Sequence, residues 1–117
     1  MERDFAIIGM ACVFPKAPDL VPFWRNVETG VDAITEVPAN RWDPVYYDPS
    51  SAAPDRVYAR RGGFIDDFAN FDAGKFGIMP AAARATEPEQ LLALQVAADA
   101  LADAGYAERQ FAREKTS

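Results

Sequence analysis

Histidine is absent from the sequence, and its absence narrows the chemistry that the chain can perform. A cysteine or serine nucleophile paired with histidine cannot be built from these 117 residues alone, and neither can a histidine-ligated metal site. Cysteine occurs once, at Cys12, so no disulfide can form within the chain, which is typical of a reducing cytoplasm. We therefore expect no catalytic residue, no metal ion and no cofactor on this chain, and a cytoplasmic location.

Basic residues and long apolar runs are also scarce. The chain has 12 Lys and Arg against 18 Asp and Glu, a net charge of -6, whereas nucleic acids and anionic membranes are bound by basic surfaces. The main apolar run, residues 5–14, is far shorter than the ~20 residues of a membrane span. Acidic residues precede this run and no small-residue cleavage site follows it, so it is not a signal peptide. We expect neither a nucleic-acid nor a membrane partner.

What is present is enough for one modest domain, since half of the residues are apolar. Residues 5–14 predict a buried strand, because the run is short, contains β-branched residues and is closed by Pro15. Gly9 stands alone there, so the run does not match the G-x-G-x-x-G pattern of a dinucleotide-binding turn. Gly74 begins only a chance match to a phosphate-binding loop.

Two helices are predicted. Over residues 19–30, Asp19 is a suitable N-cap and Gly30 a suitable stop. Over residues 87–104, Glu-Pro at the start and Gly105 after the end give the same kind of boundaries. The second helix is apolar around much of its circumference, so it needs neighbours on more than one side. We expect a larger domain to supply them. The stripe expected to face a sheet there is Leu91, Leu94, Ala98 and Leu101.

The segments between these helices predict little regular structure. Residues 31–54 contain four prolines and several large aromatic residues, which indicates an ordered loop anchored by aromatic side chains rather than a flexible linker. Residues 56–65 predict a short strand with a glycine bend at Gly62 and Gly63. Residues 68–79 predict a helical turn followed by a loop.

Several side chains could be taken for functional groups, but structural roles explain them better. Cys12 lies in the apolar run, where burial raises the pKa of a thiol and makes it inert, so we expect core packing. Arg60 and Arg61 could bind a phosphate, such as that of a phosphopantetheine arm, but the preferred interpretation is a solvated loop face or a salt bridge to the part of the domain that this chain lacks.

The acidic and aromatic residues are interpreted in the same way. The acidic residues lack the alternation of a calcium loop, so we predict turn and cap roles. These residues are Asp43, Asp48, Asp55, Asp66, Asp67 and Asp72. The aromatic residues could form a stacking platform for bases, but acidic surroundings argue against nucleic acid and favour anchors that fix the loop. They are Trp24, Trp42, Tyr46 and Tyr47.

Taken in order, seven segments resemble the β-ketoacyl synthase domains of multimodular polyketide synthases. The segments are "FAIIGMACVFP" (5–15), "FWRNVETGVDAITEVPANRW" (23–42), "YYDP" (46–49), "YARRGGFIDD" (58–67), "FDAGKFGIMP" (71–80), "EPEQ" (87–90) and "AADALADAGY" (97–106). The spacing is also similar, and the resemblance covers nearly the whole chain. Two segments, "MPAAA" (79–83) and "EPEQL" (87–91), depart from the modular pattern. Leu91 in place of the usual arginine, together with "FPKAPDL", "VPANRW" and "FAREKTS", looks more like the iterative synthases of the polyunsaturated fatty acid and enediyne type.

The resemblance implies an α/β chain, the N-terminal fragment of a thiolase-like fold with α-β-α-β-α layers. Residues 1–117 would be an incomplete N-terminal region that ends before the active-site cysteine motif "T-A-C-S-S" and two later histidines. The family is an acyltransferase that condenses an acyl thioester with a malonyl-type extender by decarboxylative Claisen condensation. Its partners are acyl carrier proteins bearing phosphopantetheine-linked acyl and malonyl groups, and it forms homodimers. The fragment alone is predicted to be inactive.

Two alternatives stay open at the level of sequence. The chain could be a truncated, non-catalytic module that pairs with a complementing synthase chain or a carrier protein. It could also be a decayed or incompletely read gene. The polar tail at residues 112–117 supplies no element that would cover the apolar helix of residues 87–104, which argues against a free-standing module.

Overall fold

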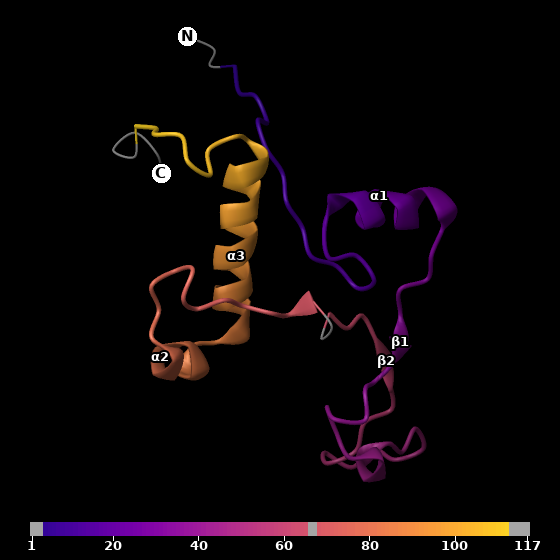
Figure 1. Ribbon diagram of the computed structural model, residues 1–117. Helices are drawn as coiled ribbons and strands as arrows, with labels where there is room; N and C mark the ends of the chain where they lie inside the picture. The colour runs from indigo at the N-terminus through magenta and orange to yellow at the C-terminus, as the bar shows by residue number, and fades with distance from the viewer. Residues whose placement is uncertain (1–3, 66–67, 113–117) are drawn as a thin grey trace. The chain divides into compact units, whose positions relative to one another are not determined.

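The computed structural model describes residues 4–65 and 68–112, and these divide between two compact units (Figure 1). One unit is the continuous segment 14–66. The other combines residues 1–13 with residues 67–117, so it is discontinuous in sequence. None of the helices in the described part of the chain has the length and hydrophobicity that a bilayer span requires.

Helix α1 (Leu20–Thr29) forms where the sequence predicts it and has both expected caps. The Asp19 side chain accepts a hydrogen bond from the backbone N–H of Val21 at 2.9 Å. Gly30 adopts a φ of 65°, the left-handed conformation that glycine tolerates without a Cβ penalty. The helix therefore begins and ends on local signals that the sequence carries.

A tight turn precedes α1 and packs against it. Phe14 and Ala17 exchange backbone hydrogen bonds of 2.8 and 2.9 Å, and the Phe14 ring stacks on Phe23 with centroids 4.7 Å apart. Lys16 has a φ of 61°, as expected at the third position of a turn with Pro15 at the second. Ala17, 1% exposed, is the one described residue that is fully buried. The core of this unit is therefore very small.

Strands β1 (Thr35–Glu36) and β2 (Arg61–Gly62) form a two-stranded antiparallel sheet, with Thr35 opposite Gly62. Only the second was predicted, within residues 56–65. At the predicted glycine bend, Gly63 packs closely against Pro15. A Cβ at Gly63 would lie 2.9 Å from the Cγ of Pro15, so a larger residue would not fit there without a shift.

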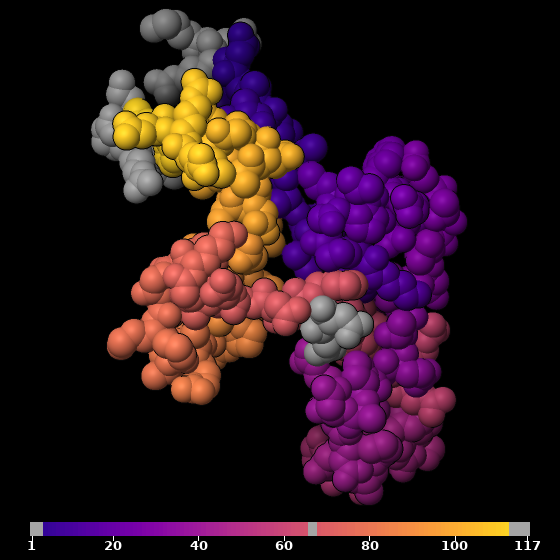
Figure 2. Space-filling view, in the orientation of Figure 1, coloured from indigo at the N-terminus to yellow at the C-terminus, as the bar shows by residue number. Residues whose placement is uncertain are grey.

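The loop between β1 and β2 is ordered, as predicted (Figure 2, magenta). It contains the short 3-10 helix η1 (Pro44–Tyr46) and a parallel bridge between Tyr47 and Val57. The Trp42 and Tyr47 rings meet edge to face at 6.4 Å. Aromatic contacts and backbone bonds therefore hold a segment that has little regular structure.

The discontinuous unit is built on α3 (Pro88–Asp103), which matches the predicted helix of residues 87–104. Gly105 follows with a φ of 77°, and the N–H of Tyr106 donates to the carbonyl of Leu101 at 2.8 Å. The short helix α2 (Pro80–Ala85) was not predicted. Before it, residues 72–78 form the predicted helical turn, with the Phe71 and Phe76 rings stacked at 5.0 Å.

The predicted strand at residues 5–14 is wrong for this structure, since residues 4–13 have no regular secondary structure. A strand needs a hydrogen-bonded neighbour, and no described segment pairs with residues 4–13. The segment runs instead beside the end of α3 (Figure 1, indigo). Phe5 and Ile7 are 91% and 84% exposed.

Contact between this segment and α3 depends on Gly9. A Cβ at this position would lie 2.5 Å from the carbonyl oxygen of Ala100 and 2.7 Å from the Cβ of Ala104. The N–H of Met10 donates to the Asp103 carboxylate at 2.9 Å. The apolar stripe of α3 is only partly covered, with Leu94 40% exposed, so its expected burial in an intact domain stays a prediction.

Candidate functional site

Cys12 lies in the irregular N-terminal segment and is half-buried. Its expected place inside a core strand is wrong, because that strand is not formed and the described part of the unit has no fully buried side chain. Within the described residues, no group of three or more Cys, Asp or Glu side chains gathers as a metal site would require. We therefore do not assign Cys12 a role as metal ligand or core residue.

Three of the six singled-out aspartates serve turns and caps, as predicted. The Asp43 carboxylate accepts from the N–H of Val45 at 3.0 Å and caps η1. That of Asp72 accepts from the N–H of Gly74 at 3.0 Å within the helical turn. Asp48 accepts from Ser50, as described below.

Of the other three, one forms an ion pair and two lie outside the described residues. Asp55 lies in a turn and its carboxylate is 3.0 Å from the Arg56 guanidinium. Asp66 and Asp67 lie outside the described residues. The predicted turn and cap roles are therefore confirmed for Asp43, Asp48 and Asp72, whereas the Asp55 side chain forms an ion pair.

Hydrogen bonds within a turn lower the pKa of Asp48. The hydroxyl of Ser50 donates to its carboxylate at 2.7 Å, and the N–H of Ser50 donates at 3.0 Å. These hydrogen bonds, the hydroxyl first, hold the pKa of Asp48 below its ordinary value, with a smaller contribution from the charge of Arg56. The cause is a local turn, so this pKa shift does not mark an active site.

Arg60 and Arg61 both pair with carboxylates of this chain and stay more than half exposed. These exposed side chains agree with the expected solvated loop face, whereas a salt bridge to the rest of the domain stays a prediction. The Nε of Arg60 lies 3.0 Å from the Glu36 carboxylate, and its guanidinium lies 5.0 Å from the Tyr47 ring centroid. The guanidinium of Arg61 donates to the Ile34 carbonyl at 3.1 Å and lies 3.6 Å from the Asp32 carboxylate. Because both guanidinium groups lie beside carboxylates, we do not assign a phosphate site to these two arginines.

The aromatic anchors are confirmed in part. Trp42 and Tyr47 are half-buried and contact each other. Tyr46 is 47% exposed and holds the loop through its carbonyl, which accepts from the N–H of Val57 at 2.8 Å. The prediction is wrong for Trp24, 61% exposed, because the residue before it on α1, Phe23, faces the turn and the helical rotation points Trp24 elsewhere.

Two hollows in the surface were not predicted. One is an apolar groove of about 550 Å³ between the end of α1 and residues 31–34, and it is lined partly by Phe14, Phe23 and Ile34. Neither ionisable side chains nor hydrogen-bond donors converge in the groove in a way that would support a reaction.

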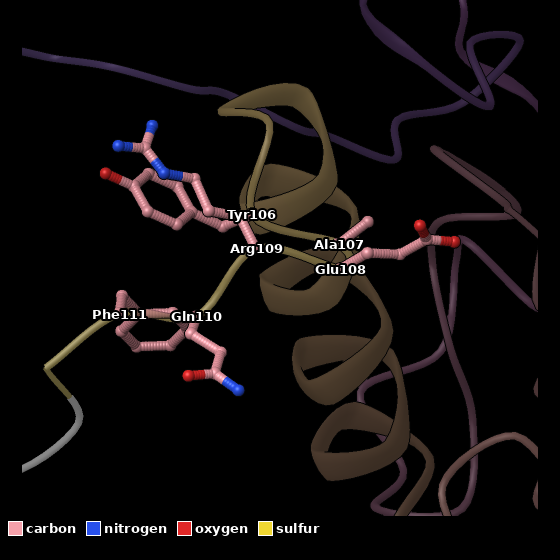
Figure 3. Close-up of a pocket in the computed structure, with 6 residues that line it drawn as sticks. All are labelled: Tyr106, Ala107, Glu108, Arg109, Gln110 and Phe111. Carbon is pink, nitrogen blue, oxygen red and sulfur yellow. The ribbon is translucent and has the colours of Figure 1, made fainter.

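The other hollow, of about 350 Å³, is lined by consecutive residues at the end of the described chain. In Figure 3 the side chains of Tyr106 and Arg109 lie together while Glu108 points away from them. The Arg109 guanidinium lies 5.2 Å from the centroid of the Tyr106 ring, and the Phe111 ring meets that ring edge to face at 5.5 Å. These contacts fold residues 106–111 back on themselves, and they are all local in sequence.

A family of known proteins and individual relatives match most of this chain. The β-ketoacyl synthase N-terminal domain family matches residues 2–117. Polyketide synthase PksN of Bacillus subtilis strain 168 is 45% identical over 97% of this chain, and polyketide synthase ThaG of Burkholderia thailandensis is 44% identical over 87%. This chain spans about 2% of the length of each of these relatives.

Solved structures agree with this match. An oxazolomycin ketosynthase domain from Streptomyces albus JA3453 has a TM-score of 0.78 and 43% identity over 85% of this chain. The ketosynthase from module 6 of the bacillaene synthase of Bacillus subtilis 168 has a TM-score of 0.73 and 34% identity over 86%. This chain spans 18% and 16% of those two chains.

The chain therefore belongs to the β-ketoacyl synthase family and corresponds to the N-terminal part of a ketosynthase domain. The predicted family is confirmed, as is the thiolase-like fold class, since the structural neighbours are ketosynthase domains. The polyunsaturated fatty acid and enediyne subclass stays a prediction, because these relatives are described as polyketide synthases.

Proposed function

We propose that this chain is the N-terminal part of a ketosynthase that extends an acyl chain by decarboxylative Claisen condensation in polyketide or fatty acid biosynthesis. The observation that carries the proposal is the match of residues 2–117 to the family, together with the structural likeness to polyketide ketosynthase domains. In this proposal the 117 residues supply scaffold, and the reacting side chains come from other parts of the domain.

The proposed reaction has two stages. A cysteine thiolate of the domain first attacks an acyl thioester on an acyl carrier protein, and the thiol of the carrier leaves. A malonyl thioester then loses carbon dioxide, and the resulting carbanion attacks the enzyme-bound acyl group. The new carbon–carbon bond forms as the cysteine thiolate is expelled. Histidines would stabilise the charge that develops, and none is present among these residues.

The partners follow from that reaction. They are acyl carrier proteins with phosphopantetheine-linked acyl and malonyl groups, and a second copy of the ketosynthase in a homodimer. The enzyme would be cytoplasmic. The alternative, a non-catalytic module that pairs with a complementing synthase chain or a carrier protein, is not favoured, because the matched relatives are polyketide synthases and the matched structures are ketosynthases.

The test uses an intact ketosynthase domain that contains residues 1–117. The domain is incubated with an acyl-loaded carrier protein and a malonyl-loaded carrier protein, and mass spectrometry follows acyl transfer and the condensed product. Cys12→Ala should load and condense like the parent, because in this proposal the acyl chain is carried by a different cysteine, in a later part of the domain. An acyl adduct on Cys12, or loss of condensation in a folded Cys12→Ala protein, would contradict the proposal.

A further inference from the structure

We draw no further inference here: the strongest candidate, the apolar groove between the carboxyl-terminal end of α1 and residues 31–34, carries nothing, because no described contact, charge pattern or neighbouring segment shows what covers it.

Discussion

At the scale of single residues, Gly9 shows how a missing side chain can determine packing. The N-terminal segment approaches α3 so closely that a Cβ at Gly9 would lie 2.5 Å from a helix carbonyl oxygen. A backbone carbonyl in a helix cannot move aside as the end of a flexible side chain can. Glycine is required here because of the contact across the unit, rather than because of its own backbone conformation.

Replacing Gly9 by alanine should therefore separate the segment from the helix. For Gly9→Ala in an intact ketosynthase we expect a loss of about 1–3 kcal/mol in the free energy of unfolding. Urea denaturation measures this loss. The matched control is Gly74→Ala, whose new Cβ would meet only a side-chain oxygen of Asp72, at 3.2 Å. Equal effects of the two substitutions would contradict the packing role.

Asp48 supports a prediction about pH. Because folding lowers the pKa of this carboxyl, the stabilisation from its hydrogen bonds is present above the unfolded pKa. It is lost as the pH falls through the folded pKa, below the ordinary value of 3.8. We expect Ser50→Ala to raise the pKa of Asp48 in an NMR titration, since the hydroxyl donor is removed. Ser51→Ala, which keeps the backbone donor, should leave the pKa unchanged; if both variants behave alike, the hydroxyl is not the cause.

At the scale of elements, α1 depends on the cap at its N-terminus. Asp19→Ala removes the acceptor for the N–H of Val21 and should lower stability by about 1 kcal/mol, as measured by thermal or urea unfolding. Asp19→Asn keeps a side-chain oxygen in place and should restore most of the loss. If D19N were as destabilising as D19A, charge rather than capping would explain the effect.

The burial of Leu94 on α3 should differ between this chain and the intact ketosynthase. In this chain its side chain is 40% exposed, so Leu94→Ala should cost little here. In the intact ketosynthase we predict that the stripe faces a sheet, and there the same change should cost about 2–5 kcal/mol. The measurement is denaturant unfolding of the intact ketosynthase domain with and without L94A. A small effect in the intact domain would show that α3 does not bury this face.

The two long helices could be predicted because their boundaries are local. Asp19, Gly30 and Gly105 act on the backbone within a few residues of themselves. Helix α2 was missed because it has only 6 residues and neither end has a local signal: its N-cap, Met79, makes no side-chain capping bond and its C-cap is Thr86 rather than glycine. The strand at residues 5–14 was wrong because strand formation depends on a neighbour that local sequence does not specify.

The residues of the candidate site also divide into those whose contacts are local in sequence, which could be predicted, and those whose contacts are distant, which could not. The capping aspartates could be predicted from side chains that bond to nearby backbone. The partner of Arg60, Glu36, and the close approach at Gly9 could not, because both join residues far apart in the sequence. The family itself was recognised from the order of its motifs rather than from composition or periodicity.

At the scale of the whole molecule, the chain has little buried core. Ala17 is the one fully buried residue among those described, while large side chains such as Phe5, Ile7 and Trp24 are mostly exposed. Expressed alone, residues 1–117 should be poorly soluble or partly molten, and should show no acyl transfer or condensation. The net charge of -6 will oppose aggregation without replacing the core.

A thermal melt and an acyl-transfer assay on the isolated chain test these two statements separately. A sharp cooperative transition from a soluble monomer would contradict the expected poor folding. Transfer of an acyl group to the isolated chain would contradict the expected inactivity. The intact ketosynthase domain, measured beside it, is the control for both assays.

The contact between Met10 and Asp103 also has a consequence for the order of events during translation. The two residues are 93 positions apart in the sequence. At synthesis rates of roughly 5–20 residues per second, the ribosome needs about 5–20 s to reach the second after making the first. Throughout that interval the apolar N-terminal segment is without its helix, so it is open to capture by chaperones or by other nascent chains.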